Sequence, residues 1–328
     1  MSHNFILCAR AIKRSKFVPE PGPSRYLKVP KAKGPILDPQ DEIEPKQWVE
    51  DLRQAATWRK AATKQDRDRG DLIVFVHGYN NDAEIIVKRH NRLEQDLRSV
   101  GYKGAFMTFC WPSDSKALNY LEDRHDAKKS AMQLVSDGIK LLSMHQRQDC
   151  SINIHLIGHS TGAYVIREAF DDADDSALPN NSWSVSQIAF IGADLSAESM
   201  REGNPVSASL YRHCHRLTNY YSNYDSALKL SNAKRVGVAP RVGRVGLPSG
   251  APRKAVDVDC SEYFDQLNGS EEIQSADQFE RLGSFDHSWH IGNRIFALDL
   301  FETIKGDLDR AVVPTRREKD GKLVLTRV

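Results

Sequence analysis

Residues 152–162 read Ile-Asn-Ile-His-Leu-Ile-Gly-His-Ser-Thr-Gly. The segment 152–157 predicts a buried strand, and the chain that follows Ser160 predicts a helix. A Gly-x-Ser-x-Gly pentapeptide at a strand-to-helix junction is typical of a nucleophile elbow, a sharp turn that lifts the serine hydroxyl clear of the sheet. Glycine on both sides suits such a strained turn. We therefore expect Ser160 to be a nucleophile, and the alternative interpretation is a helix N-cap after a glycine turn.

Strands and helices alternate on both sides of this junction. The predicted strands are residues 72–76, 105–111, 152–157, 187–191, 217–221 and 255–258. The predicted helices are residues 44–58, 82–100, 118–144, 162–170 and 291–304. This alternation predicts an α/β fold, with a doubly wound, mostly parallel sheet flanked by helices.

The chain on either side of the alternating region has a different composition. We expect residues 66–308 to be the catalytic domain, residues 1–65 an N-terminal extension that packs on it, and residues 309–328 a basic C-terminal tail. Lys, Arg and Pro are frequent between residues 9 and 45, so the sequence predicts irregular chain there, apart from a strand near residues 26–29.

Charge and cysteine content narrow the class of protein. The 328 residues include 46 basic and 44 acidic side chains, and a net charge of +2 gives no electrostatic reason to expect nucleic acid or an anionic membrane as partner. The apolar stretch Phe5–Cys8 is too short for a signal peptide and predicts a first strand, and no stretch approaches the roughly 18 apolar residues of a membrane span. The 5 cysteines include no Cys-x-x-Cys pair. They predict reduced thiols in a cytoplasmic protein, with a disulfide-bonded secreted protein as the alternative.

A second glycine-containing loop follows the predicted strand 72–76. It reads His77-Gly78-Tyr79-Asn80 and lies about where hydrolases with a nucleophile elbow place the loop that donates a second N–H to the oxyanion. We expect the oxyanion donors to be the backbone N–H of Tyr79 or Asn80 together with that of Thr161. The alternative is a plain turn at the end of a strand. For His77 itself we expect a buried, structural role.

A serine nucleophile needs a base with a pKa near 7, which in practice is a histidine. The chain order of this fold is serine, acid, histidine, and His287 and His290 lie in the late loop where the base belongs. We favour His287, because it lies further from the helix that follows.

The acid that orients the base has three candidates. Asp225 follows the predicted strand 217–221 and is favoured, because this is the commonest position for the acid. Asp194 is the alternative acid or a structural residue, and Asp286 is the weakest candidate because neighbouring side chains seldom turn toward each other. Candidates for a substrate pocket are Gly78, His159, Trp111 and Trp289, although the tryptophans could equally be buried structural residues. No cofactor or metal motif is present.

The sequence resembles a bacterial family of α/β hydrolases, largely of unknown function and related to esterases and lipases. The resemblance covers roughly residues 70–305 and rests on residues 74–80, 109–113, 120–124, 155–162, 193–194, 221–228 and 286–288. It implies a triad of Ser160, Asp225 and His287. Our own expectation from these residues is a serine hydrolase that cleaves a small-molecule carboxylic ester. The resemblance fixes neither the substrate nor the oligomeric state. Thioester hydrolysis, acyl transfer, and a non-catalytic interaction protein with the same fold are the alternatives.

Overall fold

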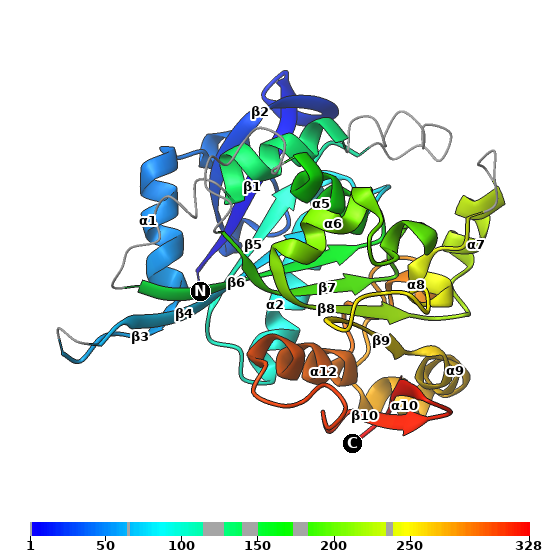
Figure 1. Cartoon of the computed structure of the whole chain (residues 1–328). Helices are drawn as coiled ribbons and strands as arrows, with labels where there is room; N and C mark the ends of the chain where they lie inside the picture. The colour runs from blue at the N-terminus through cyan, green and yellow to red at the C-terminus, as the bar shows by residue number, and fades with distance from the viewer. Residues whose placement is uncertain (1, 64–65, 114–127, 140–149, 173–182, 234–238) are drawn as a thin grey trace.

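The computed structural model describes residues 2–63, 66–113, 128–139, 150–172, 183–233 and 239–328. A single sheet runs through the molecule in the order β10-β11-β9-β8-β7-β6-β4-β5-β1-β2, with β3 beside β4 (Figure 1). Its centre consists of parallel strands at the predicted places: β4 (Asp68–Val76), β5 (Ala105–Cys110), β6 (Cys150–His159), β7 (Val185–Ile191), β8 (Cys214–Tyr221) and β9 (Ala255–Asp259). The predicted fold class, a doubly wound and mostly parallel sheet flanked by helices, is confirmed.

Helices cover both faces of the sheet (Figure 1). On one side, α1 (Pro45–Ala56), α5 (Thr161–Asp172) and α6 (Pro205–Arg212) share a core with Val74 and Val76 of β4. On the other side, α2 (Ala83–Ser99), α9 (Ser261–Gly269) and α12 (Arg294–Lys305) share a core with Ile73 and Phe75 of the same strand. Because successive strand residues point to opposite faces, a strand covered on both sides has to be apolar throughout.

Shorter elements complete the described chain. They are β3 (Thr57–Arg59), α7 (Ser226–Ala233), α8 (Val242–Val245), α10 (Glu271–Ala276) and α11 (Phe285–Ser288), with short 3₁₀ turns at Lys31–Lys33, Pro39–Asp41 and Glu198–Met200. Residues 128–133 are α-helical and continue into a π-helix at Leu134–Ile139. The remainder of the helix predicted over 118–144 lies outside the described residues.

The prediction of irregular chain between residues 9 and 45 is wrong for most of its first half. β1 (His3–Lys13) pairs with β5 in parallel, and β2 (Lys16–Pro30) pairs with β1 as the edge strand of the sheet. Prolines at an edge strand remove no essential hydrogen bond, so a Pro-rich sequence can still be a strand there. The apolar stretch Phe5–Cys8, which predicted a first strand, does lie within β1.

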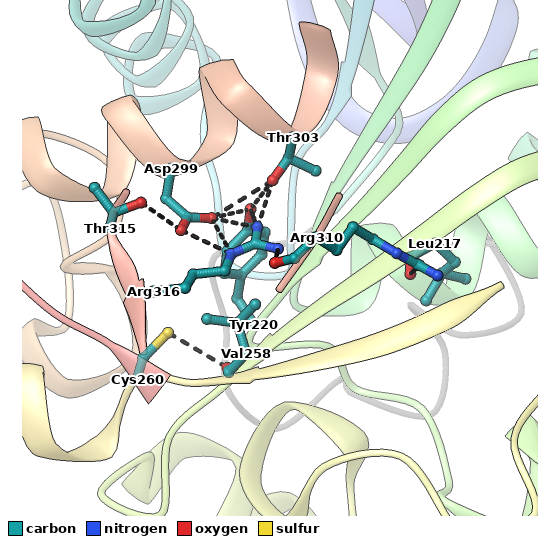
Figure 2. Close-up of polar contacts among 9 residues, drawn as sticks. All are labelled: Leu217, Tyr220, Val258, Cys260, Asp299, Thr303, Arg310, Thr315 and Arg316. Atoms are coloured by element: carbon teal, nitrogen blue, oxygen red, sulfur yellow. Dashed lines mark hydrogen bonds and ion pairs between the residues drawn. The ribbon is translucent and has the colours of Figure 1, made fainter. Parts of the chain in front are cut away.

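The last residues also join the sheet. β10 (Arg316–Lys319) and β11 (Lys322–Leu325) form a hairpin, and β11 lies beside β9. Arg316 is buried, and its Nε lies 2.9 Å from Asp299 Oδ2 of α12. Figure 2 shows these two side chains facing each other. A basic residue in this segment is therefore part of the interior. The sheet takes strands from all three segments into which the sequence was divided, and whether these segments are separate domains stays a prediction.

The strand order changes direction beside β4. β5 lies on one side of β4 and β6 on the other, so the chain leaves this point in opposite directions. In open α/β sheets, the carboxyl ends of strands at such a switch point border a crevice where ligands bind. His77 directly follows β4 and Ser160 directly follows β6, so both predicted loops lie at the carboxyl ends of strands at this switch point.

Candidate active site

Ser160 occupies the sharp turn between β6 and α5. Its backbone φ is +55°, a left-handed conformation that costs energy for a residue other than glycine. The turn is held from both sides, because the Ser160 N–H donates to the Ile191 carbonyl at 2.9 Å and the Ser160 carbonyl accepts from the N–H of Asp194 and of Ala163, each at 3.1 Å. The predicted strand–turn–helix arrangement is thus present and backed by hydrogen bonds.

Gly78 brings the second predicted loop against this serine. A Cβ placed on Gly78 would lie 2.7 Å from Ser160 Cβ and 3.0 Å from the His159 carbonyl oxygen, so only glycine fits. The backbone of the His77–Asn80 loop therefore passes within contact distance of Ser160. Steric contact with Ser160 and His159 therefore explains why position 78, which the sequence analysis singled out, is a glycine.

Three carbonyl groups of this loop accept hydrogen bonds from side chains of the protein. Asn81 Nδ2 donates to the carbonyls of Gly78 (2.7 Å) and Tyr79 (3.0 Å), and Trp111 Nε1 donates to the His77 carbonyl (2.7 Å). In a trans peptide the N–H points opposite to the carbonyl of the same unit. The N–H groups of Tyr79 and Asn80 therefore point away from the Asn81 amide. This agrees with their predicted role as oxyanion donors, which stays a prediction, as does the role of the Thr161 N–H.

His287 and Asp225 meet across the site. His287 Nδ1 lies 2.6 Å from Asp225 Oδ2, although the residues are 62 positions apart in the chain. The side chain of His287 is 11% exposed and that of Asp225 is 2% exposed. Burial by itself lowers the pKa of His287, but the Asp225 carboxylate outweighs it, so the pKa of His287 lies above its ordinary value of 6.5.

Asp225 is fixed by the start of α7. Its Oδ1 accepts the N–H of Leu228 at 2.9 Å, which leaves Oδ2 for the imidazole. Asp286, the weakest of the predicted acids, has another function: its Oδ2 accepts the N–H of Ser226 and so links α11 to α7. The helix that carries the base is thereby tied to the helix that begins at the acid.

The remaining histidines of the site differ from His287. His159 Nε2 lies 3.2 Å from the His287 carbonyl oxygen, and both nitrogens of His290 are without a hydrogen-bond partner among the described residues. Burial lowers the pKa of His159 and of His290 well below the ordinary value, and the neighbouring His287 lowers both further. Both rings are therefore neutral, and His287 alone of the three is paired with a carboxylate.

Asp194, the alternative acid, faces a different partner. Its Oδ1 lies 3.1 Å from Arg241 Nε, and both side chains are buried. Its N–H also supports the turn at Ser160. The structure therefore brings Asp225, and not Asp194, into contact with His287.

The two predicted pocket tryptophans are fully buried. Trp111 stacks on His77 with 5.5 Å between ring centroids, and Trp289 stacks on His290 at 4.0 Å. Both rings pack against histidines in the loops of the site. Whether they, Gly78 and His159 line a substrate pocket stays a prediction.

Two arginines of the site escaped sequence analysis. Arg10 of β1 contacts the loop at Asn81, and Arg89 of α2 contacts the loop that precedes His287. Each partner is more than 70 residues away in the chain, so no local pattern could identify them. Asn81 was also missed, although it directly follows the loop that was predicted.

The described part of the chain has neither a cluster of metal ligands nor a membrane-spanning helix. No group of three or more His, Cys, Asp or Glu side chains has the geometry to hold a metal ion. No described helix has the length and apolarity required to cross a membrane.

Residues 53–276 match the family described as alpha/beta hydrolase of unknown function (DUF900). An uncharacterized protein of Nostoc sp. is 26% identical over 154 residues, a stretch that spans 39% of this chain and 39% of that protein. Among solved structures, dienelactone hydrolase from Anabaena variabilis is 15% identical with a TM-score of 0.34, covering 65% of this chain and 86% of its own. Lipase B from Aspergillus fumigatus is 13% identical with a TM-score of 0.40, covering 82% of this chain and 62% of its own. The family match spans more than half of the sequence, so the chain belongs to the α/β hydrolases of unknown function.

Proposed function

We propose that this protein is a serine hydrolase that cleaves carboxylic esters, with Ser160 as nucleophile, His287 as base and Asp225 as acid. The observation that carries the proposal is the 2.6 Å contact between His287 Nδ1 and Asp225 Oδ2. The loop of His287 meets the strained turn at Ser160 through His159, whose Nε2 lies 3.2 Å from the His287 carbonyl oxygen. A contact to Nδ1 fixes the tautomer and leaves Nε2 to accept a proton. The raised pKa of His287 suits a base that works near neutral pH.

The proposed reaction has two halves. In the first, His287 Nε2 takes the Ser160 proton while Oγ bonds to the ester carbonyl carbon, and the negative oxygen accepts N–H bonds from Thr161 and from Tyr79 or Asn80. The carbon–oxygen bond to the leaving group then breaks, and His287 returns its proton to the departing alcohol. In the second half, water repeats the attack on the acyl group, which releases a carboxylic acid and restores Ser160.

The substrate proposed here is a small-molecule ester. The same residues could process thioesters or pass the acyl group to an alcohol, so a series of esters and thioesters of graded acyl length would define the preference. For location, we propose the cytoplasm. The buried free thiols of Cys8, Cys110, Cys214 and Cys260 support a reducing compartment.

Labelling with a fluorophosphonate probe tests the nucleophile. The wild-type protein should be labelled and should hydrolyse p-nitrophenyl acetate, while Ser160→Ala should lose both properties. Ser209→Ala is the matched control, because Ser209 is also buried but donates to the Phe170 carbonyl on α5. Labelling or turnover that persists in Ser160→Ala would contradict the assignment, and an unlabelled, inactive wild-type protein would favour a non-catalytic role.

A further inference from the structure

The buried arginines that the structure describes fall into two groups. Arg167, Arg241 and Arg316 each face a carboxylate, contributed by Glu168, Asp194 and Asp299 respectively. Arg10 and Arg89 are just as buried, with 3% and 6% of their surface exposed. Neither has an ion-pair partner among the described residues. Burying an unpaired cation is costly, so these positions call for a specific explanation.

Arg10 holds the loop that follows β4. Its Nη2 donates to the Asn81 carbonyl at 2.8 Å and lies 3.3 Å from both the carbonyl and the hydroxyl oxygen of Ser113. Ser113 Oγ in turn donates to the same Asn81 carbonyl at 3.1 Å. Asn81 is the residue whose amide binds the carbonyls of Gly78 and Tyr79. Arg10 thus fixes the residue that orients the predicted oxyanion loop.

Arg89 holds the loop that carries His287. Its Nη2 donates to the Leu282 carbonyl at 3.1 Å and to Ser288 Oγ at 3.2 Å, and its Nε lies 3.3 Å from the same carbonyl. Gly283, at φ +127°, leaves room for this guanidinium, because a Cβ there would lie 2.4 Å from Nη2. Burial without a carboxylate lowers the pKa of Arg89 to about 10, so it still carries its charge at neutral pH.

We propose that Arg10 and Arg89 are paired positioning residues, one setting the oxyanion loop and the other setting the loop of the base. The inference rests on the proposed function. Backbone carbonyls and hydroxyls take the place of carboxylates at both guanidinium groups, so no described carboxylate pairs with the positive charge of Arg89. Arg89 lies on α2, and its charge opposes protonation of His287. Arg10 instead contacts the loop that follows β4.

Several groups share the environment of His287. Asp225 and Asp194 raise the pKa of His287, and Arg89 lowers it. His159 and His290 also interact with His287 but stay neutral. Asp286, on the same helix, is committed to Ser226 and Ser284. Of the described residues, Arg89 is therefore a cation whose removal should raise the pKa of the base.

The experiment compares Arg10→Met with Arg89→Met, following kcat/KM for p-nitrophenyl acetate across pH. Arg10→Met should lower kcat/KM by about tenfold to a hundredfold, as expected for a misplaced catalytic group, with the midpoint of the pH profile unchanged. Affinity for a trifluoromethyl ketone, which mimics the tetrahedral intermediate, should fall in parallel. Arg89→Met should also lower the rate, and it should move the acid limb of the profile to higher pH, because loss of a cation raises the pKa of His287.

Conservative variants separate positioning from general stability. Arg89→Lys keeps the charge and should keep the wild-type midpoint, while its lower rate reflects a single ammonium that cannot bond both Leu282 and Ser288. Arg10→Lys should recover part of the rate lost in Arg10→Met. Arg167→Met is the control, a buried arginine with a carboxylate partner, whose pH midpoint should stay at the wild-type value.

If a methionine variant shows no cooperative unfolding, Ser113→Ala and Ser288→Ala replace it, because each removes one acceptor with little change in volume. Each should lower kcat/KM measurably. Wild-type kcat/KM and pH midpoints in all the folded variants would overturn the inference, even if their melting temperatures fall. That outcome differs from failure of the proposed function, in which the wild-type protein is inactive and unlabelled or Ser160→Ala itself keeps its activity.

Discussion

Two buried ion pairs of this molecule differ in what surrounds them. Asp299 and Arg316 have no exposed side-chain surface, whereas the His287 side chain that faces Asp225 is 11% exposed. Tyr220, Thr303 and Thr315 complete the network around Asp299 and Arg316, as Figure 2 shows. The hydrogen bonds of that network join buried side chains to one another.

The contrast separates a structural pair from a candidate for chemistry. A guanidinium stays charged at any pH at which the protein is folded, so the pair of Asp299 and Arg316 can lock α12 to β10 but cannot transfer a proton. An imidazole titrates near neutral pH and has a second nitrogen. Burial and a short contact are common to both pairs. Only the pair of Asp225 and His287 also has a member that titrates near neutral pH, and that member contacts His159, the neighbour of the strained Ser160.

The same substitution in both pairs tests this contrast with the largest expected effect. Asp225→Asn should lower kcat by about ten-thousand-fold, because an amide no longer fixes the imidazole tautomer or stabilises its cation. Asp299→Asn should lower stability but leave kcat of the folded enzyme at its wild-type value. The measurement is kcat for p-nitrophenyl acetate, paired with urea unfolding of each variant. Similar rate losses in both variants would erase the distinction.

Changes in the pair of Asp299 and Arg316 should affect the free energy of unfolding instead of the rate. Arg316→Met leaves the Asp299 carboxylate buried without its cation, which should reduce the free energy of unfolding by about 3 to 5 kcal/mol. Replacing both residues, as Arg316→Met with Asp299→Leu, should cost less than the single change, since no charge is then left unpaired. Urea unfolding gives the free energies. A single variant as stable as wild type would show that the network does not lock the hairpin.

A third carboxylate sharpens the choice of acid. Asp194→Asn disturbs the pair with Arg241 but leaves His287 and Asp225 in contact, so kcat of the folded enzyme should fall by less than about tenfold, far below the loss in Asp225→Asn. Rates are corrected for the folded fraction measured by circular dichroism. A loss that matches Asp225→Asn would make Asp194 the acid.

The central strands could be predicted from the sequence because a short stretch of neighbouring residues specifies each of them. Each apolar strand, and likewise the turn at Ser160, is specified by residues that lie within a few positions of one another. The usual chain order of the triad residues then reduced the candidates for the base to His287 and His290. The contact of His287 with Asp225 then followed as an expectation from the order of elements. These are the features that short stretches of sequence specify.

The remaining features depend on distant partners. The first part of β2, residues 16–25, was predicted to be irregular because it contains several prolines. Those prolines are compatible with a strand because β2 lies at the edge of the sheet. Arg316 looked like part of a solvated tail, and its burial depends on Asp299 and Tyr220, which belong to other elements. Arg10 and Arg89 contact loops more than 70 residues away. The sequence around a charged residue does not indicate that its side chain will be buried and bonded to a carbonyl that is distant in the chain.

The smallest expected effect is a shift in pH dependence. His287 has to be neutral to accept the Ser160 proton, so kcat/KM should fall as the pH drops through the pKa of His287, with a midpoint above the ordinary value of 6.5. In Asp225→Asn the residual activity should have its midpoint lower, by on the order of one pH unit, because burial then acts on the imidazole without an opposing carboxylate. Asp299→Asn should leave the midpoint in place. A midpoint that follows Asp299 instead, or one that ignores Asp225, would mean that the 2.6 Å contact does not govern the titrating base.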